Sequence, residues 1–314
     1  MNSGKSAEKV NPRWRVFLMG FSIVVAIAAI VFVRMAMDSS RVRVGSPQEL
    51  SAYFDEIGYS ASLLRTGNAS IPRITMASVP KSWADGLTVD RKKSLFFRAL
   101  LPMVMIVNGE ISADRSRLLK LRQNLSANNP ISSGDIAWIQ RMSDAYGLKT
   151  TGQDPVIKTV NLLLKRVDII PPSLALAQGA VESAYGSSRF AVDGNALFGQ
   201  WKYGDGLVPG EQRTALGDYR IAVFDSPLDS IRAYMRNLNT NRAYSTFRQL
   251  RDDARRRGER PRGPPLAAGL LAYSEKGQAY VSLIRSLIAR NGLSAADGAR
   301  LRDMSTTRIA TGPF

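Results

Sequence analysis

The most distinctive hydrophobic pattern is an uninterrupted apolar run near the N-terminus. It extends from Val16 to Val33 without a charged residue, and roughly 17–25 apolar residues are needed for a helix that crosses a bilayer. Four Lys and Arg residues precede the run, against one acidic residue, Glu8. Since basic flanks stay in the cytoplasm, we expect residues 1–15 to form a cytoplasmic tail and residues 16–34 an uncleaved transmembrane anchor. A cleavable signal peptide is the alternative, but its apolar region is normally shorter.

Beyond the anchor, apolar residues recur mainly at helical spacing. Residues 35–87 are predicted to be a stalk and linker with one short helix, because Ser46 and Glu49 have the spacing of a capping box. Within the linker, residues 66–87 are expected to be irregular. Longer helices with an apolar face are predicted over residues 88–107 with a kink at Pro102, 113–125, 134–146, 155–167, 227–238 and 277–290.

Glycines interrupt the helical pattern between residues 193 and 226. Six of them fall within this stretch, which also contains the β-favouring segment Tyr219–Phe224. We therefore expect a small glycine-rich β lobe inserted in a mainly α (α+β) domain. Residues 294–314 are expected to form a C-terminal tail.

The composition restricts the chemistry more than the fold. The chain contains no His and no Cys, which excludes Ser-His-Asp and Cys-His catalysis and the usual zinc sites. In an enzyme of this composition, proton transfer falls to Asp, Glu, Tyr or Lys, and a carboxylic acid held in its protonated form is the common solution. We predict no metal and no cofactor.

The formal charge of +17 indicates an anionic partner. Residues beyond the predicted anchor lie outside the cytoplasm, so we expect the membrane and the cell envelope as partners, and no nucleic acid. Seven arginines between residues 248 and 262 form a basic run. A solvated loop and a surface attracted to anionic groups of the envelope are both open interpretations of this run.

Glu182 is the candidate for acid catalysis. Pro171, Pro172 and Ser173 form a favourable helix start, and an apolar stripe from Leu174 onwards predicts a buried helix with Glu182 near its C-terminal end. A carboxyl flanked by apolar surface has a raised pKa and stays protonated, as a general acid requires. From the pattern alone, a solvated glutamate is the competing interpretation.

A longer motif surrounds this glutamate. Residues 175–201 read ALAQGAVESAYGSSRFAVDGNALFGQW, which resembles the signature of the family 73 glycoside hydrolases, the glucosaminidase domain, in its Bax-type branch. The motif joins Glu-Ser-x-x-Gly-x-Ser to Asn-x-Leu-Phe-Gly about a dozen residues later. Further matches occur at residues 222–226, 234–244 and 271–280, and the likeness extends from about Ile71 to Leu293.

The resemblance implies a lysozyme-like helical domain that hydrolyses the β-1,4 bond after N-acetylglucosamine in peptidoglycan, with Glu182 as general acid. Residues 88–293 would then be the catalytic domain with an N-terminal helical extension. The anchor would lie in the cell inner membrane and this domain in the periplasm. Residues expected to bind the substrate, several by stacking on sugar rings, are Tyr185, Asn195, Phe198, Gly199, Trp201 and Tyr273.

The second catalytic group is left open by the motif. Glycosidases commonly use two carboxyl groups, and Glu211 is the first candidate because it lies in the glycine-rich stretch, followed by Asp218. A substrate-assisted route through the N-acetyl group needs neither. A catalytically inactive wall-binding or scaffold protein of the same fold is the alternative function. An amidase is disfavoured because the chain lacks the residues of the usual zinc site. The sequence does not indicate an oligomeric state.

Overall fold

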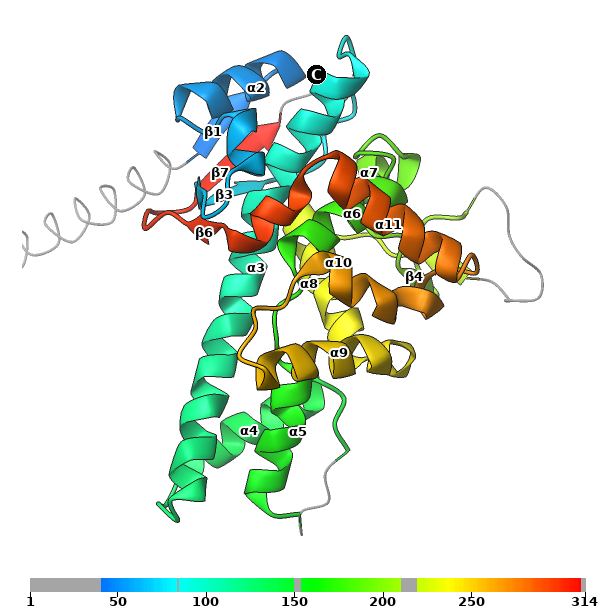
Figure 1. Ribbon diagram of the computed structural model, residues 1–314. Helices are drawn as coiled ribbons and strands as arrows, with labels where there is room; N and C mark the ends of the chain where they lie inside the picture. The colour runs from blue at the N-terminus through cyan, green and yellow to red at the C-terminus, as the bar shows by residue number, and fades with distance from the viewer. Residues whose placement is uncertain (1–40, 84, 150–153, 210–218, 312–314) are drawn as a thin grey trace, which may run out of the picture. The chain divides into compact units, whose positions relative to one another are not determined.

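The computed structural model describes residues 41–83, 85–149, 154–209 and 219–311 (Figure 1). Contacts within the chain group Arg43–Phe314 into one compact unit and Met1–Val42 into another. The predicted cytoplasmic tail and the predicted anchor, Val16–Val33, lie outside the described residues. The sequence prediction of a mainly α fold is confirmed, since helices account for most of the described secondary structure.

The longest helix, α3 (Val89–Ser126), has 38 residues and is capped by the side chain of Thr88. Two helices with a break between residues 107 and 113 were expected, and this prediction is wrong: the chain stays helical through the break and through Pro102. Burial against neighbouring helices explains the difference, because tertiary packing offsets the cost of a lone glycine or proline in a helix. Of the described helices, α3 is long and apolar enough to cross a membrane, but 83% of its apolar window is buried inside the protein, as in a core helix.

Three helices pack against α3 and form the core of the compact unit (Figure 1). They are α5 (Val156–Arg166), α6 (Pro172–Glu182) and α8 (Pro227–Thr240). Residues 172–180 of α6 are all buried, so α6 is a central helix with protein on every side over most of its length. The remaining helices are α2 (Pro47–Glu56), α4 (Ser133–Ala145), α7 (Arg189–Gly194), α9 (Ser245–Arg256), α10 (Gly263–Leu266) and α11 (Gln278–Arg290), with 3₁₀ helices η1 (Ala61–Arg65), η3 (Arg242–Tyr244), η4 (Ala267–Tyr273) and η5 (Leu293–Gly298).

The predicted β lobe is present as a two-stranded antiparallel sheet. Strand β4 (Trp201–Tyr203) pairs with β5 (Tyr219–Ile221), and Trp201 lies opposite Ile221. The backbone hydrogen bonds between Leu207 and Ile221 extend this pairing by one bridge. The segment that joins the two strands includes residues 210–218, which lie outside the described residues.

The expected linker and tail contain short strands that pair with each other. Strands β1 (Arg41–Val44), β7 (Thr307–Thr311) and β3 (Ile74–Met76) form one sheet in the order β1-β7-β3. Strand β2 (Ser70–Ile71) pairs in parallel with β6 (Arg300–Leu301). The prediction that residues 66–87 are irregular is therefore wrong for β2 and β3, and the other described residues of this stretch form no helix or strand. Strands of two to five residues leave no visible period in the sequence, and their partners lie more than 200 residues away.

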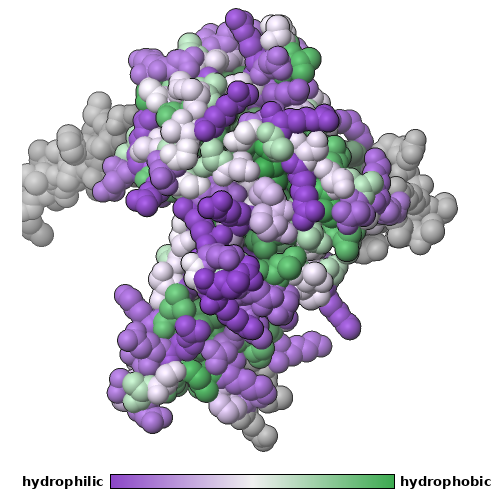
Figure 2. Space-filling model, viewed as in Figure 1, coloured by the Kyte–Doolittle hydropathy of each residue, from purple (hydrophilic) through white to green (hydrophobic). Residues whose placement is uncertain are grey.

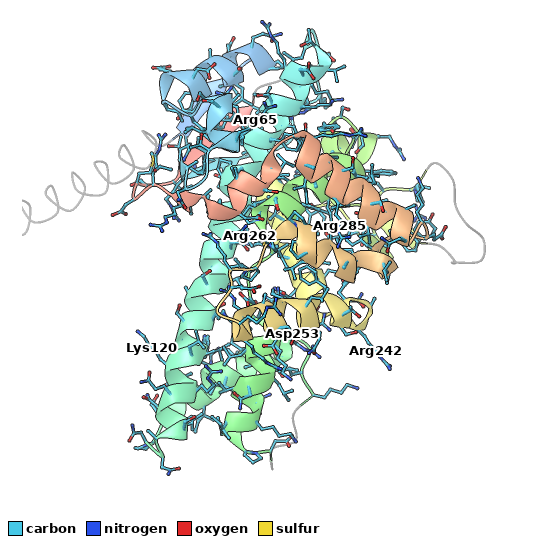
Figure 3. The ribbon with its side chains drawn as sticks, viewed as in Figure 1. Arg65, Lys120, Arg242, Asp253, Arg262 and Arg285 are labelled. Atoms are coloured by element: carbon cyan, nitrogen blue, oxygen red, sulfur yellow. The ribbon has the colours of Figure 1, made fainter. Side chains whose placement is uncertain are left out.

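The basic run is largely part of the folded body. Its first part is α9, and five of its seven arginines hold partners within the protein: Arg248, Arg251, Arg255, Arg256 and Arg257. The solvated-loop interpretation is therefore wrong for Arg248, Arg251 and Arg255, whereas Arg256 and Arg257 are exposed. Asp253 lies on α9, and Arg262 lies at the turn into α10 (Figure 3). Hydrophilic residues cover much of the face in Figure 2.

Arg251 is the most deeply placed member of the run, with 1% of its surface exposed. It donates hydrogen bonds to four backbone carbonyls between residues 165 and 169, at the end of α5, and to Oδ1 of Asn239. Nearby, Arg255 donates two hydrogen bonds to the carboxylate of Asp168, at 3.0 and 2.8 Å. Arg251 and Asp168 therefore fix the connection between α5 and α6.

Candidate active site

The start of α6 is fixed by side chains from distant parts of the chain. Asp297, in η5, accepts hydrogen bonds from the backbone NH and the hydroxyl of Ser173 and from the backbone NH of Gly263, each at 2.9 Å. Burial raises the pKa of Asp297, and these hydrogen bonds oppose the rise. Asn108, on α3, pairs with both backbone groups of Ile170 at 2.8 and 3.0 Å. The helix that carries Glu182 is thus held at its N-terminal end by α3 and η5.

The chain turns sharply after Glu182, the last residue of α6. Ala184, Tyr185 and Gly186 follow with positive φ angles of 51°, 58° and 81°. Left-handed geometry costs roughly 1–2 kcal/mol at a residue other than glycine, so the turn must be held by specific contacts. The buried Ser183 supplies them: its hydroxyl donates to the carbonyl of Gly179 at 2.6 Å and accepts from the NH of Gly186 at 2.8 Å.

The glycine and the second serine of the motif also have structural roles. A Cβ atom at Gly186 would lie 2.9 Å from Nε1 of Trp83, which is closer than real contacts allow. That indole nitrogen donates to the carbonyl of Tyr185 at 2.7 Å. Ser188 caps α7 by accepting from the NH of Ala191. The Glu-Ser-x-x-Gly-x-Ser motif therefore describes a helix end, a left-handed turn and the next helix start.

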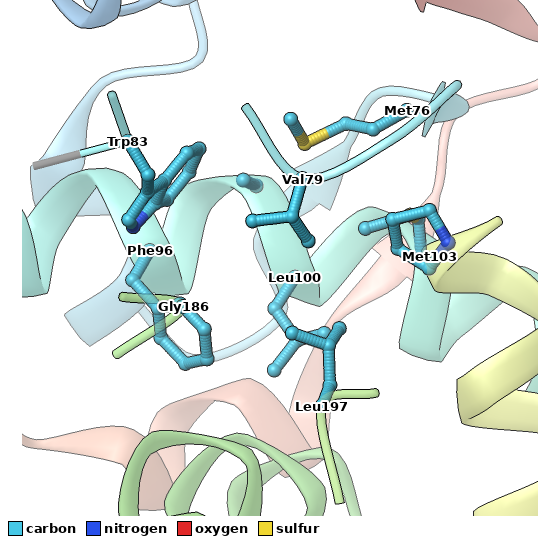
Figure 4. Close-up of a pocket in the computed structure, with 10 residues that line it drawn as sticks. Met76, Val79, Trp83, Phe96, Leu100, Met103, Gly186 and Leu197 are labelled. Atoms are coloured by element: carbon cyan, nitrogen blue, oxygen red, sulfur yellow. The ribbon is translucent and has the colours of Figure 1, made fainter. Parts of the chain in front are cut away.

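An apolar cavity lies beside this turn (Figure 4). It is lined by residues such as Met76, Trp83, Phe96 and Leu197, and its volume is about 20 Å³. A space of this size holds about one water molecule, so a sugar ring does not fit. The cavity belongs to the packing behind the turn.

The carboxyl group of Glu182 is half-buried, and its two oxygens have different surroundings. Oε1 accepts a hydrogen bond from the hydroxyl of Tyr280, on α11, at 2.8 Å. Oε2 lies toward Gly199, where an added Cβ would be 3.7 Å away, and accepts no recorded hydrogen bond from the described residues. Burial raises the pKa of Glu182, and the hydrogen bond from Tyr280 offsets part of this effect. The group therefore keeps its proton to a higher pH than an ordinary glutamate.

Aromatic residues surround this carboxyl. The ring of Tyr280 stacks on that of Tyr273, with centroids 5.4 Å apart and planes at 9°. The hydroxyl of Tyr273 donates to the carbonyl of Phe198 at 3.2 Å, and the Phe198 ring stacks on Tyr234 at 3.9 Å. Burial raises the pKa of Tyr273, and the nearby Glu182 charge adds to the rise. These contacts tie α8, η4 and α11 to the segment that contains Phe198.

The residues predicted to bind substrate occupy different environments. Phe198 is buried against Tyr234, while Tyr273 is half-buried beside Tyr280. Tyr185 packs edge-on against Phe96 and Phe97, with both pairs of centroids 5.8 Å apart.

Asn195 and Gly199 shape the loop on either side of Phe198. Asn195 has a φ of 51°; its side chain accepts from the NH of Val79 and donates to the carbonyl of Phe224, both at 2.9 Å. Gly199 has a φ of 58° and faces Oε2 of Glu182. The Asn195 side chain therefore connects three parts of the chain.

Trp201 lies on the β lobe and is 54% exposed, more than any other predicted aromatic of the site. Its ring is tilted over Tyr219, with centroids 4.6 Å apart. Glu211 and Asp218, the two candidates for the second carboxylate, lie outside the described residues.

Three residues near Glu182 were missed by sequence reasoning as site residues: Gln178, Tyr234 and Tyr280. Tyr280 lies in the helix predicted over residues 277–290 from its apolar face, and it is buried. A signal for Gln178 was present, because it is a polar residue within an apolar helix and lies one turn before Glu182.

Comparison with known proteins gives three findings. Residues 158–293 match the family model Glucosaminidase, described as mannosyl-glycoprotein endo-beta-N-acetylglucosaminidase. The Protein bax of Escherichia coli (strain K12) is 30% identical over 201 residues, which cover 64% of this chain and 70% of that protein. The catalytic domain of the autolysin Auto from Listeria monocytogenes is 18% identical with a TM-score of 0.31, covering 56% of this chain and 96% of that one.

Proposed function

This chain belongs to the Bax-type glucosaminidase family, and on that premise we propose that it hydrolyses the β-1,4 glycosidic bond after N-acetylglucosamine in peptidoglycan. The observation that carries the proposal is the state of Glu182. Its carboxyl is half-buried, its pKa is raised by burial, and Oε2 accepts no hydrogen bond from the described residues. A glycosidic general acid needs these properties.

In the proposed reaction, Oε2 of Glu182 donates its proton to the glycosidic oxygen as the bond to the anomeric carbon breaks. The leaving sugar departs as a neutral alcohol, and Glu182 is left as a carboxylate whose Oε1 is stabilised by the hydroxyl of Tyr280. The oxygen of a water molecule finally bonds to the anomeric carbon, and the proton that this water loses returns to Glu182 through the assisting group or the solvent. We propose Glu211 as the group that assists the water, with Asp218 or the N-acetyl group of the substrate as alternatives.

We propose that the substrate lies over the surface between Gly199 and the β lobe. Gly199 borders Oε2 of Glu182, and Trp201 follows it by two residues with an exposed ring. A flat ring suits the face of a sugar, and Tyr273 and Tyr185 would supply further aromatic surface. Phe198 would support the loop of residues 195–199 by stacking on Tyr234. Asn195 would fix the conformation of this loop through its hydrogen bond to the carbonyl of Phe224.

We propose that residues 16–34 anchor the protein in the cell inner membrane, with the N-terminus in the cytoplasm and the catalytic domain in the periplasm. The apolar run and the basic residues before it support this topology. A reporter that fluoresces only in the cytoplasm, fused after Phe314, is expected to stay dark. Fluorescence would reject the periplasmic location.

The proposed activity is tested by digesting purified peptidoglycan with the full chain in mild detergent. Mass spectrometry of the products is expected to show N-acetylglucosamine at the new reducing end. N-acetylmuramic acid there would reject the proposed bond. Binding without any release would favour the non-catalytic wall-binding alternative, and the Glu182→Gln variant serves as the control for contaminating hydrolases.

A further inference from the structure

We propose that Gln178 and Tyr234 are positioning residues that keep the catalytic proton on Oε2 of Glu182, through a chain of hydrogen bonds that runs in one direction. The proposal rests on the role of Glu182 proposed above. The chain has three bonds: the hydroxyl of Tyr234 donates to Oε1 of Gln178 at 2.7 Å, Nε2 of Gln178 donates to the hydroxyl of Tyr280 at 3.0 Å, and that hydroxyl donates to Oε1 of Glu182 at 2.8 Å.

The direction is set at the far end, by Tyr234. Both Tyr234 and Gln178 have no exposed surface, so water does not provide an alternative partner. A buried hydroxyl needs an acceptor for its single hydrogen. Among the described residues, Gln178 accepts the hydrogen bond from Tyr234. The carbonyl oxygen of the Gln178 amide must therefore face Tyr234.

The remaining two bonds follow from the chemistry of the groups. An amide that turns its oxygen to Tyr234 turns its NH₂ group to Tyr280, and this NH₂ group donates and never accepts. The hydroxyl of Tyr280 is then an acceptor on one side. Its own hydrogen is free to point to Oε1 of Glu182, which lies at hydrogen-bond distance.

The consequence concerns the two oxygens of Glu182. In the protonated carboxyl group, Oε1 accepts from Tyr280 and so does not carry the acid hydrogen. The hydrogen is placed on Oε2, the oxygen that lies toward Gly199. If the amide of Gln178 were reversed, Tyr280 would donate to Gln178 instead, and the acid hydrogen would point into the buried tyrosine and away from the substrate. Tyr234, three hydrogen bonds away from Glu182, thereby acts on the orientation of the catalytic acid.

Among the described residues, the charge of Glu182 affects the pKa values of four tyrosines. They are Tyr234 on α8, Tyr244 in η3, Tyr273 in η4 and Tyr280 on α11. Burial raises the pKa of each. All four are therefore uncharged near neutral pH, so none of these tyrosines changes its charge while Glu182 titrates.

The test measures the pKa of Glu182 directly, in full-length protein with ¹³C-labelled glutamate, and the Glu182→Gln variant identifies its signal. Tyr280→Phe removes the bond to the carboxylate and is expected to raise the pKa by about one unit. Tyr234→Phe leaves Tyr280 in place but releases the amide of Gln178. We expect a smaller rise, by about half a unit, and a roughly tenfold fall in kcat at unchanged KM.

Tyr59→Phe is the matched control, because Tyr59 is fully buried and its hydroxyl has no hydrogen-bond partner among the described residues. It is expected to leave both the pKa of Glu182 and kcat unchanged. A wild-type pKa in Tyr234→Phe, with a rise in Tyr280→Phe, would overturn the positioning role while leaving Glu182 as the acid. If the pKa values follow the expected order but the wild-type protein releases no sugar, the proposed function is rejected. The hydrogen-bond chain from Tyr234 to Glu182 is then retained.

Discussion

Asp168 and Glu182 are both carboxylates inside the helical body, yet folding moves their pKa values in opposite directions. Burial raises both. At Asp168 this effect is exceeded by the hydrogen bonds from Arg255 and the charges of Arg251 and Arg115, so the pKa falls. At Glu182 the opposing contribution is one hydrogen bond from a neutral tyrosine, and the pKa rises.

The difference separates a structural carboxylate from a candidate catalytic one. Both oxygens of Asp168 bind Arg255, and its position fixes the chain between α5 and α6. Only Oε1 of Glu182 accepts a hydrogen bond from the described residues, and Oε2 accepts none from them. The comparison indicates that burial alone does not identify an acid catalyst in this protein. The deciding feature is that none of the described residues places a cation beside Glu182, whereas three arginines lower the pKa of Asp168.

The largest expected effect is on activity at Glu182. Glu182→Gln keeps the shape of the side chain and its acceptor for Tyr280 but removes the acid proton, so sugar release should fall by about 10²–10⁴-fold. The release of reducing ends from peptidoglycan measures it, with circular dichroism as the check on folding. Wild-type release by a folded variant would remove Glu182 from the mechanism.

The corresponding change at Asp168 should act on stability. Asp168→Asn leaves the buried Arg251 without its compensating charge, and breaking a buried ion pair from one side costs about 3–5 kcal/mol. Urea unfolding measures this loss, and activity per folded molecule should be retained. Asp252→Asn removes the exposed ion pair with Arg256 and is the control, with an expected cost below about 1 kcal/mol. Equal losses in the two variants would contradict the structural role of Asp168.

The two carboxylates should also give opposite dependences of stability on pH. The pKa of Glu182 is raised by folding, so its stabilising contribution is complete below the pKa of the unfolded chain and is lost as pH rises through the folded value. Glu182→Gln should therefore be more stable than wild type at neutral pH, by about 1.4 kcal/mol for each unit of the shift. The contribution of Asp168, whose pKa is lowered, is present at neutral pH and is lost on acidification. Urea unfolding from pH 3 to 8 compares them.

The smallest effect is expected from Arg255→Lys. A lysine keeps the positive charge near Asp168 but cannot form the two parallel hydrogen bonds of the guanidinium group. We expect a loss of about 1 kcal/mol in the free energy of unfolding, with no change in the pH dependence of sugar release. A shift of that pH dependence would show that the two carboxylates are coupled.

Local features of the fold were predictable from sequence and distant pairings were not. The faces of α4, α5, α8 and α11 follow the helical spacing of apolar residues, and all four are confirmed within a few residues. The strands β2, β3, β6 and β7 were missed, because each is short and is stabilised by a partner far away in the chain. The continuous helix through Gly109 was also missed, since its stability comes from packing.

The candidate site shows the same division. Glu182 was found from its place at the end of an apolar helix and from the motif around it. Arg251 was grouped with exposed arginines, since a buried arginine has no sequence mark, and its role depends on carbonyls more than 80 residues away. The role of Gln178 likewise depends on tyrosines 56 and 102 residues away, which come near it only in the folded chain.

The cap on α6 has a consequence for how this protein is made. Asp297 holds the first turn of α6 but follows it by 124 residues, and it lies beyond the matched family segment, which ends at residue 293. During synthesis, Glu182 therefore leaves the ribosome long before the side chain that secures its helix. The candidate active site would be completed only after Asp297 has been synthesised, so a fragment cut at residue 293 would contain Glu182 without the side chain that holds the start of its helix.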